Sequence, residues 1–449
     1  MTASNRTPSS ALPSGSTEQP KAVGGTDLRT RLDLKLQIHR YLLSKLDLDK
    51  IFTSDETTRA QVFALIEDVV ARLPLESSER KKLAVEVLNE VFGLGPLEPL
   101  MQDPGVTDIL VNGSHDVYVE RAGVLEETKA GFKDDAHLMR VIQKIVFAIG
   151  RRIDESSPMV DARLPDGSRV NVIIPPVAID GPHLSIRRFG RTPVSEADLL
   201  KNQTLTAAML DLLKASVAAR LNIVISGGTG AGKTTLLNVL SGWISSKERI
   251  VTIEDAAELQ LKQRHVVRLE CRPGNAKGEG VVAARHLVTN SLRMRPNRII
   301  VGEVRGEEAL DMLQAMKTGH DGSLTTVHAN TPRDALARME TMAMMANLNI
   351  GERAIRRQIV SGISLVIQVA RMTDGTRRLT HITEVTGMET DIVSMQDIFL
   401  FEQRGVGSDG RIIGNFMATG IRPKFSEKLK AAGFELPGTL FDVSEPRRR

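Results

Sequence analysis

Apolar and polar residues follow different patterns along the chain, and each pattern predicts a different kind of structure. Residues 1–30 are rich in Ser, Thr, Pro and Gly and cannot bury enough apolar area to offset chain entropy, which predicts a disordered tail. Over residues 31–93, apolar positions recur at helical spacing in three stretches, so we predict a small bundle of amphipathic helices. The apolar positions of the three stretches include Leu34, Ile38, Leu42 and Leu46, then Val62, Ile66 and Val69, then Leu83, Val87 and Val91.

After the third helical stretch, short apolar runs alternate with turn residues. Asn112-Gly113 and Asp166-Gly167 each stand between two such runs, and these dipeptides are typical of tight turns between paired strands. Residues 135–150 return to helical spacing. The pattern therefore predicts an α+β domain over 94–190, which a linker at 191–204 joins to the rest of the chain.

In the remaining half of the chain, continuous apolar runs alternate with helical segments. Wholly apolar strands indicate a mostly parallel sheet that helices cover on both faces. Residues 205–449 are therefore predicted to form one α/β domain with a C-terminal extension. The clearest strands of this domain are at 222–226, 249–253 and 298–302.

The composition limits the classes of protein to which the chain can belong. Hydrophobic residues make up 41% of its 449 residues and charged residues 25%, which excludes a mostly disordered or fibrous chain. No apolar run approaches the roughly 20 residues of a membrane span, and the first residues lack a secretory signal. The single cysteine, Cys271, cannot form an internal disulfide or a multi-thiolate zinc site. We therefore expect a cytoplasmic protein.

The positive net charge of the chain does not by itself indicate nucleic-acid binding. The formal net charge is +4, but Arg447, Arg448 and Arg449 supply +3 of it at the C-terminus. Aromatic residues are only 3% of the chain, so stacking platforms for single-stranded nucleic acid are poorly supplied. We therefore expect no nucleic-acid partner.

A glycine-rich segment follows the first strand of the α/β domain. Gly227-Gly228-Thr229-Gly230-Ala231-Gly232-Lys233-Thr234 matches G-x-x-x-x-G-K-[ST] and opens an apolar helix. Such a loop turns backbone N–H groups toward phosphates, and the helix N-terminus adds its positive end. Lys233 is expected on the β- and γ-phosphates and Thr234 on Mg²⁺, with Thr235 completing the nucleotide-binding segment.

Carboxylates follow the next two strands. Glu254 and Asp255 come after the strand at 249–253, and Glu303 comes after the strand at 298–302. A P-loop enzyme needs acids at the carboxyl ends of neighbouring strands to hold metal and orient water. Gly302 stands where such a strand usually carries an aspartate, so Glu303 is interpreted as the residue that orients the attacking water.

Two histidines lie among small polar residues further along the chain. His320 and His328 are eight residues apart, and no other Cys or His accompanies them, so they make a poor metal site. Histidine can instead donate to a phosphate or to charge that develops on it. Both histidines are therefore candidate catalytic residues.

The order of these motifs resembles the type II/type IV secretion and pilus ATPases. It runs from the phosphate loop through Thr252-Ile-Glu254-Asp255 and Gly302-Glu303-Val-Arg305-Gly to the histidine segment at 318–330. The resemblance covers residues 94–449. It implies a RecA-like ATPase domain, a smaller PAS-like N-terminal domain, and ATP and Mg²⁺ as cofactors. It gives Glu254 a place near the metal, directly or through a water.

Within that family, the chain looks most like the CpaF branch of Tad/Flp pilus motors. The similarity lies in the segment at 93–100, in 106–113 and in the N-terminal helical extension. That branch implies a homohexamer that powers pilus assembly, and in some members retraction, through inner-membrane platform proteins. The type IV secretion ATPase is the alternative. Cousins with a four-cysteine zinc module are excluded by the single cysteine.

The resemblance also draws attention to arginines of the N-terminal domain. In the family, arginines of the corresponding region help to clamp the nucleotide phosphates as the two domains close. Arg169 and Arg187 are the preferred candidates here, ahead of Arg163 and Arg188. An arginine suits this task because its planar fork stays charged and binds phosphate through two hydrogen bonds. Arg305 is better interpreted as part of a structural ion pair.

Two other classes of function stay open from the residues alone. A nucleic-acid motor on the same core would show ATPase stimulation by DNA or RNA and binding that falls steeply with salt. A nucleotide-gated scaffold would bind ATP without releasing phosphate. The motif order favours a hydrolysing secretion or pilus motor over both.

Overall fold

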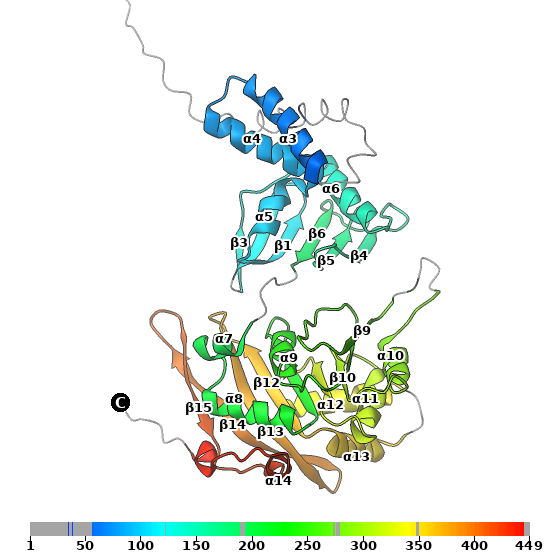
Figure 1. Cartoon of the computed structure of the whole chain (residues 1–449), viewed down its shortest axis with the longest axis vertical. Coiled ribbons are helices and arrows are strands. Elements are labelled where there is room, and N and C mark those ends of the chain that lie inside the picture. The colour runs from blue at the N-terminus through cyan, green and yellow to red at the C-terminus, as the bar shows by residue number, and fades with distance from the viewer. Residues whose placement is uncertain are drawn as a thin grey trace, which may run out of the picture.

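The computed structural model describes residues 35, 38, 56–121, 123–188, 194–272, 274, 279–346 and 350–443. The predicted tail, most of the first helical stretch and residues 191–193 of the predicted linker lie outside them. The described chain is α/β, as predicted, with one sheet of six strands and one of nine (Figure 1). Among the described residues, no helix has both the length and the apolar character needed to cross a membrane.

The two remaining helical stretches form a packed pair. α3 (Glu56–Ala71) and α4 (Ser77–Phe92) enclose a cluster in which Val62, Ile66, Leu83 and Val87 are buried. Ile38 joins the same cluster. The sequence pattern therefore located the buried faces of these helices correctly.

The end of α4 is fastened to the neighbouring sheet domain. Lys144 of α6 (Asp135–Ala148) donates from Nζ to the carbonyl oxygens of Val91 and Gly93, both at 2.7 Å. A cation is favourable there because the last carbonyls of a helix carry partial negative charge. His137 Nδ1 accepts from a backbone amide, so its Nε2–H donates to buried Glu90 at 3.0 Å. These contacts tie α4 to α6.

The six-stranded sheet is antiparallel, in the order β3-β2-β1-β6-β5-β4. Both predicted turns connect adjacent strands, with Asn112 opposite Asp116 in one pair and Arg163 opposite Arg169 in the other. α6 buries Leu138, Ile142 and Ile145 in the core of this domain. The strands are β1 (Val106–Asn112), β2 (Asp116–Arg121), β3 (Val124–Glu127), β4 (Met159–Arg163), β5 (Arg169–Ile173) and β6 (His183–Arg187), and η1 (Gly95–Leu97) and α5 (Glu98–Gln102) precede them.

The nine-stranded sheet runs in the order β15-β14-β13-β12-β7-β11-β10-β8-β9. The six strands from β12 to β9 are parallel, as predicted, and β13 to β15 extend the sheet as an antiparallel meander. The parallel strands are β7 (Ile223–Gly227), β8 (Ile250–Glu254), β9 (Val266–Glu270), β10 (Arg298–Val301), β11 (Leu324–Val327) and β12 (Leu365–Arg371). The meander consists of β13 (Arg377–Glu389), β14 (Ile392–Val406) and β15 (Ile412–Ala418).

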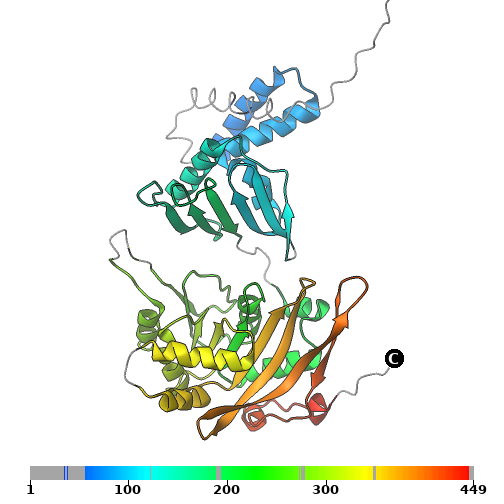
Figure 2. The ribbon, with the colours of Figure 1, turned by 180° about the vertical axis from the view of Figure 1, so that it is seen from behind.

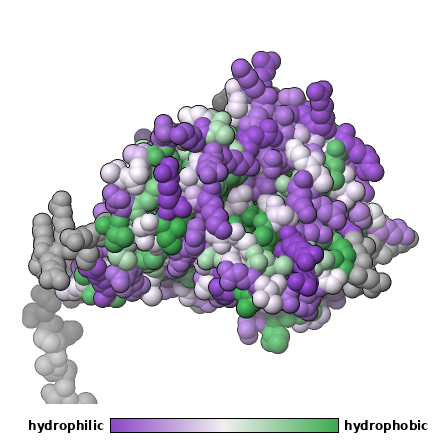
Figure 3. Space-filling view, turned by 90° about the horizontal axis from the view of Figure 1, so that it is seen from below, coloured by the Kyte–Doolittle hydropathy of each residue, from purple (hydrophilic) through white to green (hydrophobic). Residues whose placement is uncertain are grey.

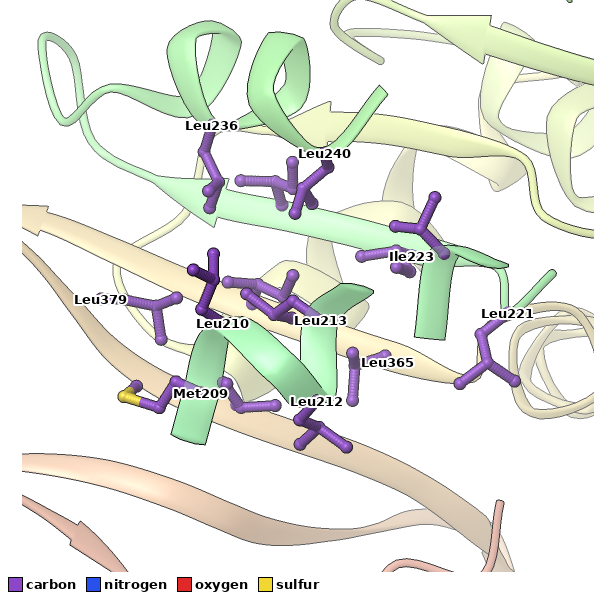
Figure 4. Packing of buried hydrophobic residues seen from close by; sticks show 14 of the residues in the cluster. Met209, Leu210, Leu212, Leu213, Leu221, Ile223, Leu236, Leu240, Leu365 and Leu379 are labelled. Atoms are coloured by element: carbon purple, nitrogen blue, oxygen red, sulfur yellow. The ribbon is translucent and has the colours of Figure 1, made fainter. Parts of the chain in front are cut away.

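Successive residues of the central strand serve two different cores. Ile223 and Ile225 of β7 pack with α8 (Ala207–Ala218) and α9 (Lys233–Ser241). The close view shows Ile223 in this cluster, with Leu213 of α8 and Leu240 of α9 (Figure 4). Val224, between them, packs on the opposite face. Side chains alternate in this way along any strand, so both faces of a doubly covered sheet must be apolar.

The helices of the other face lie in front when the molecule is seen from behind (Figure 2). They are α10 (Ala284–Ser291), α11 (Glu308–Lys317), α12 (Pro332–Met344) and α13 (Glu352–Gly362). Short elements complete the domain: α7 (Glu196–Lys201), α14 (Ser426–Ala431) and η2 (Gly438–Phe441). Seen from the end opposite the N-terminal sheet, the surface is mainly hydrophilic with scattered apolar patches (Figure 3).

Buried polar groups fix the amino ends of the parallel strands. Arg298, at the start of β10, has a fully buried side chain that forms two 2.8 Å hydrogen bonds with Glu248. It also donates to the carbonyl oxygen of Val217 at 2.8 Å. Asn222, just before β7, donates to the carbonyl of Gly362 at 2.7 Å and accepts from the amide of Gly322 at 2.8 Å. These groups tie helices and strands together at the amino edge.

Candidate active site

The glycine-rich segment forms the loop between β7 and α9 at the carboxyl edge of the parallel sheet. Gly230 and Gly232 have φ values of +69° and +97°, a region that side chains disfavour, so the loop can wrap only with glycine there. Lys233 lies at the start of α9, and its Nζ donates to the carbonyl oxygens of Gly227 at 3.0 Å and Gly228 at 3.1 Å. The ammonium is thus held over the loop that would wrap phosphate.

The surroundings of Lys233 are electropositive. Burial lowers the pKa of its ammonium, and the charges of Arg305, Arg187 and Arg338 lower it further, while Glu303 acts in the opposite sense. An excess of positive charge in a partly dehydrated place favours an anion there. The loop therefore has both the shape and the electrostatics of a phosphate site.

Glu303 lies close to this lysine but is engaged by an arginine. Its Oε2 accepts from Arg305 Nε at 3.0 Å and from Nη2 at 2.7 Å. Arg305 also contacts Asp255 Oδ2 from Nη1 at 3.1 Å. The predicted ion pair of Arg305 is confirmed, and it joins the acids that follow β8 and β10.

Glu254 ends β8 and is buried. Its Oε1 accepts from the amides of Glu258 at 2.8 Å and Leu259 at 2.9 Å, while Oε2 has no hydrogen-bond partner among the described residues. Burial raises the pKa of this carboxyl, and the two amide hydrogen bonds oppose that shift. A buried oxygen without a partner is the feature expected of a ligand for a metal or a water.

The same glutamate explains why position 302 carries glycine. A Cβ built on Gly302 would come 2.8 Å from Cγ and 3.3 Å from Oε1 of Glu254. The space in which an aspartate side chain would start is therefore filled by Glu254. Gly302 sets where this carboxylate can lie.

We predict that Gly302→Ala displaces Glu254 and lowers ATP turnover by roughly 10- to 100-fold, because small displacements of positioned groups cost that much. The dissociation constant of the Gly302→Ala variant for MgATP should differ from that of the wild type by less than about threefold, because the phosphate loop is unchanged. Phosphate release and nucleotide titration measure the two effects. Gly438→Ala is the matched control, since a Cβ there meets nothing within 4 Å. Turnover equal to that of the control would contradict the role of Gly302.

The two histidines lie at opposite ends of β11. His328 follows the strand, and its pKa is lowered by burial and by the charge of Lys233, while Glu303 raises it. It therefore lies with the phosphate loop. His320 precedes β11, at the amino edge of a strand parallel to β7, so the length of the strand separates it from the loop. The sequence predicts that His320 assists catalysis with His328, whereas this topology places His320 at the opposite edge of the sheet from the phosphate loop.

The arginines of the N-terminal sheet have different surroundings. Arg169 reaches the ATPase domain and contacts Glu258 Oε1 at 3.1 Å. Arg163 donates to the carbonyl oxygen of Ala257 at 2.8 Å. Both contacts fall on the segment whose amides hold Glu254, whereas Arg187 is near enough to Lys233 to affect its pKa.

Arg188 differs from these three arginines. It donates within its own domain to the carbonyl oxygens of Val106, at 3.0 Å, and Asp103.

Two further arginines lie next to the phosphate loop, Arg371 and Arg377. The sequence did not predict them because no motif marks them. Only the pairing of β12 with β13 brings them together.

The donor set suits a magnesium ion that is shared with phosphate. No cluster of three or more His, Cys, Asp or Glu side chains suited to a metal occurs in the described part of the chain. Mg²⁺ typically keeps waters and binds through one or two carboxylates together with substrate phosphates. The hydroxyl of Thr234 and the unpartnered Oε2 of Glu254 are compatible with such a site.

Comparison with known proteins extends this description. Residues 90–409 match the family described as type II/IV secretion system protein. A putative conjugal transfer protein of Mycobacterium tuberculosis is 40% identical over 299 residues, which are 65% of this chain and 84% of that protein. The type IV secretion system protein PtlH of Bordetella pertussis is 34% identical over 313 residues, 64% of this chain and 92% of that protein.

Two solved structures are also similar to parts of the chain. The VirB11 ATPase of the Brucella suis type IV secretion system is 28% identical with a TM-score of 0.36, covering 66% of this chain and 97% of that one. The pilus retraction motor PilT bound to ADP is 20% identical with a TM-score of 0.47, covering 64% and 80%.

Proposed function

The chain belongs to the type II/IV secretion system protein family, and we propose that it is an ATP-hydrolysing motor of a secretion or pilus machine. The observation that carries this proposal is the meeting of Lys233, Glu303 and His328 at one edge of the sheet. They follow β7, β10 and β11, which are neighbouring parallel strands, so they lie at the edge of the sheet that carries the phosphate loop.

Each of these residues has a chemical role in the proposal. Lys233 binds the β- and γ-phosphates, and Glu303 accepts a proton from the attacking water once Arg305 releases it. His328 donates to charge that develops on the phosphate. A bound Mg²⁺ would be held by Thr234 and, through Oε2, by Glu254, and would neutralise phosphate charge.

The N-terminal domain takes part through its arginines. Arg187 completes the positive surroundings of Lys233, and Arg169 contacts the segment that holds Glu254. We propose that nucleotide binding and hydrolysis change these contacts, so that the two domains move against each other. A homohexamer at the cytoplasmic face of the inner membrane would pass that movement to platform proteins of the machine.

Two kinds of machine are candidates. The sequence segments at 93–100 and 106–113 favour assembly, with or without retraction, of a Tad/Flp-type pilus. The names of the similar proteins favour a type IV secretion or conjugal transfer system. Deleting the gene and measuring surface pili and substrate transfer in the same cells separates the two, because the pilus proposal fails if pili remain normal.

We predict that Lys233→Ala removes both ATP binding and turnover, since the ammonium that faces the phosphates is lost. The affinity for MgATP should fall at least 100-fold, roughly 2.7 kcal/mol or more. Fluorescence titration and steady-state phosphate release measure the two losses. Lys247→Ala, an exposed lysine beyond the other end of α9, is the matched control. If Lys233→Ala binds MgATP as tightly as the control, the phosphate-loop assignment is wrong. Separately, release of phosphate by the wild type would exclude a scaffold that binds ATP without hydrolysing it.

A further inference from the structure

The hairpin of β12 and β13 places two arginines beside the phosphate loop. Arg371 ends β12, Arg377 begins β13, and the two are direct cross-strand partners. Arg377 Nε donates to the carbonyl oxygen of Gly230 at 3.0 Å. Arg371 Nη1 lies 3.3 Å from the place where a Cβ of Gly230 would be. Both guanidinium groups therefore border the tip of the loop.

This pair is electrostatically unfavourable by itself. Like charges directly opposite each other destabilise a pair of strands. The nearby acid is Glu120, whose Oε2 is 3.8 Å from Arg371 Nη1. Among the described residues, no carboxylate lies within ion-pair distance of Arg377. Burial and the charge of Arg371 both lower the pKa of Arg377, as expected of a cation without a close counter-ion.

The hairpin is also held in place. Asp374, in its turn, accepts from the amide of Thr376 at 2.9 Å and from the amide of Ile412 at 2.8 Å. The second of these bonds joins the turn to the start of β15. The arginines are thus fixed next to the loop before any ligand arrives, which reduces the entropy lost on binding.

We propose that Arg371 and Arg377 are additional phosphate-binding residues for the nucleotide held by the phosphate loop. The inference rests on the proposed function, since it assigns more of the same site. An anion between the two guanidinium groups removes their mutual repulsion, and planar guanidinium groups bind phosphate oxygens through paired hydrogen bonds. The nucleotide triphosphate supplies that anion.

Arg371 also links this site to the N-terminal domain. Its guanidinium is 3.0 Å from the place where a Cβ of Gly123 would be, and Glu120 on β2 is its acidic neighbour. A phosphate that draws Arg371 toward the loop weakens its attraction to Glu120. The same residue would therefore sense the nucleotide and touch the domain that is proposed to move.

The test compares nucleotide binding by wild type, Arg377→Gln and Arg371→Gln/Arg377→Gln in the full-length protein. We expect the dissociation constants for MgATP and MgADP to rise at least tenfold in the double variant, while that for adenosine changes less than twofold. Arg353→Gln is the matched control, because Arg353 pairs with Asp391 beyond the far end of β13. Unchanged ADP and ATP affinities would overturn the inference.

A second measurement separates phosphate binding from simple support of the loop. If the arginines await an anion, the double variant without nucleotide should melt at the same or a higher temperature than the wild type, and ADP should stabilise it less. A lower melting temperature with full stabilisation by ADP would show that Arg377 only braces Gly230, and would overturn the inference. A third outcome would also overturn the inference. In it, inorganic phosphate stabilises the wild type but not the double variant, while the double variant binds ADP as tightly as the wild type.

The same measurements distinguish failure of the arginine proposal from failure of the proposed ATPase function. A wild-type protein that binds neither ATP nor ADP would refute both proposals. A wild type that binds ATP and hydrolyses it, with a double variant that binds equally well, would refute only the role of the two arginines.

Discussion

Replacing Glu303 by Gln is expected to abolish ATP turnover while ATP still binds. Glu303 is the carboxylate near both Lys233 and His328, and glutamine cannot accept the proton of the attacking water. Loss of a general base lowers the rate by about 10²- to 10⁴-fold, or roughly 3–5 kcal/mol of barrier. Phosphate release measures the loss, and titration with MgATP measures the binding that remains.

The matched control for this prediction is Glu307→Gln. Glu307 lies four residues further along and pairs with Arg285 at 2.8 Å, so the control also removes a carboxylate from an ion pair. It should keep turnover within about twofold of the wild type. If Glu303→Gln releases phosphate as fast as this control, Glu303 is not the catalytic base and the carboxyl of Glu254 becomes the candidate.

Arg298→Met is expected to be the most destabilising single substitution at the amino edge of the large sheet. The change removes both hydrogen bonds of Arg298 to Glu248, whose side chain is only 14% exposed, and leaves that carboxylate with the longer contact to Arg220 at 3.8 Å. It also removes one of the two hydrogen bonds that the carbonyl oxygen of Val217 accepts, the other being from the amide of Arg220 at 3.1 Å. Removing one partner of a buried ion pair costs about 3–5 kcal/mol. A fall of roughly 6–20 °C in melting temperature follows for a domain of this size.

The double variant Arg298→Met/Glu248→Leu separates loss of the pair from loss of volume. Replacing both partners by apolar residues is often neutral, so much of the lost stability should return. The pH dependence gives a second check. Although burial alone would raise it, the hydrogen bond from Arg298 holds the pKa of Glu248 below its usual 4.5. The pair therefore stabilises the fold fully when the pH is above 4.5, the pKa of Glu248 in the unfolded chain. Its contribution is lost as the pH falls through the lower pKa of the folded state. A single variant as stable as the double one would contradict this account.

The sequence predicted elements best where a local pattern decides the structure. The helical spacing at 135–150, the two turn dipeptides and the apolar strands at 222–226 and 298–302 all predicted elements that the structure contains. Each follows from side-chain period or turn chemistry over a few residues. The phosphate loop belongs with them, because its glycines and lysine act within one strand–loop–helix unit.

The sequence was less reliable wherever distance through space mattered. It grouped His320 with His328 because they are close along the chain, yet β11 separates them by its whole length. It could not show that Glu254 fills the space beside Gly302, which explains a motif that lacks its usual aspartate. It also gave no sign of Arg371 and Arg377.

Sequence alone thus determined which chemical groups the chain has and which strand or loop carries each of them, since that depends on neighbours a few positions away. The tertiary structure decided which groups share a site. Parallel strands bring residues about 70 positions apart, Lys233 and Glu303, to one edge, and a strand register sets Arg371 opposite Arg377. Sheet order and register are set by packing of the whole core, which no local pattern encodes.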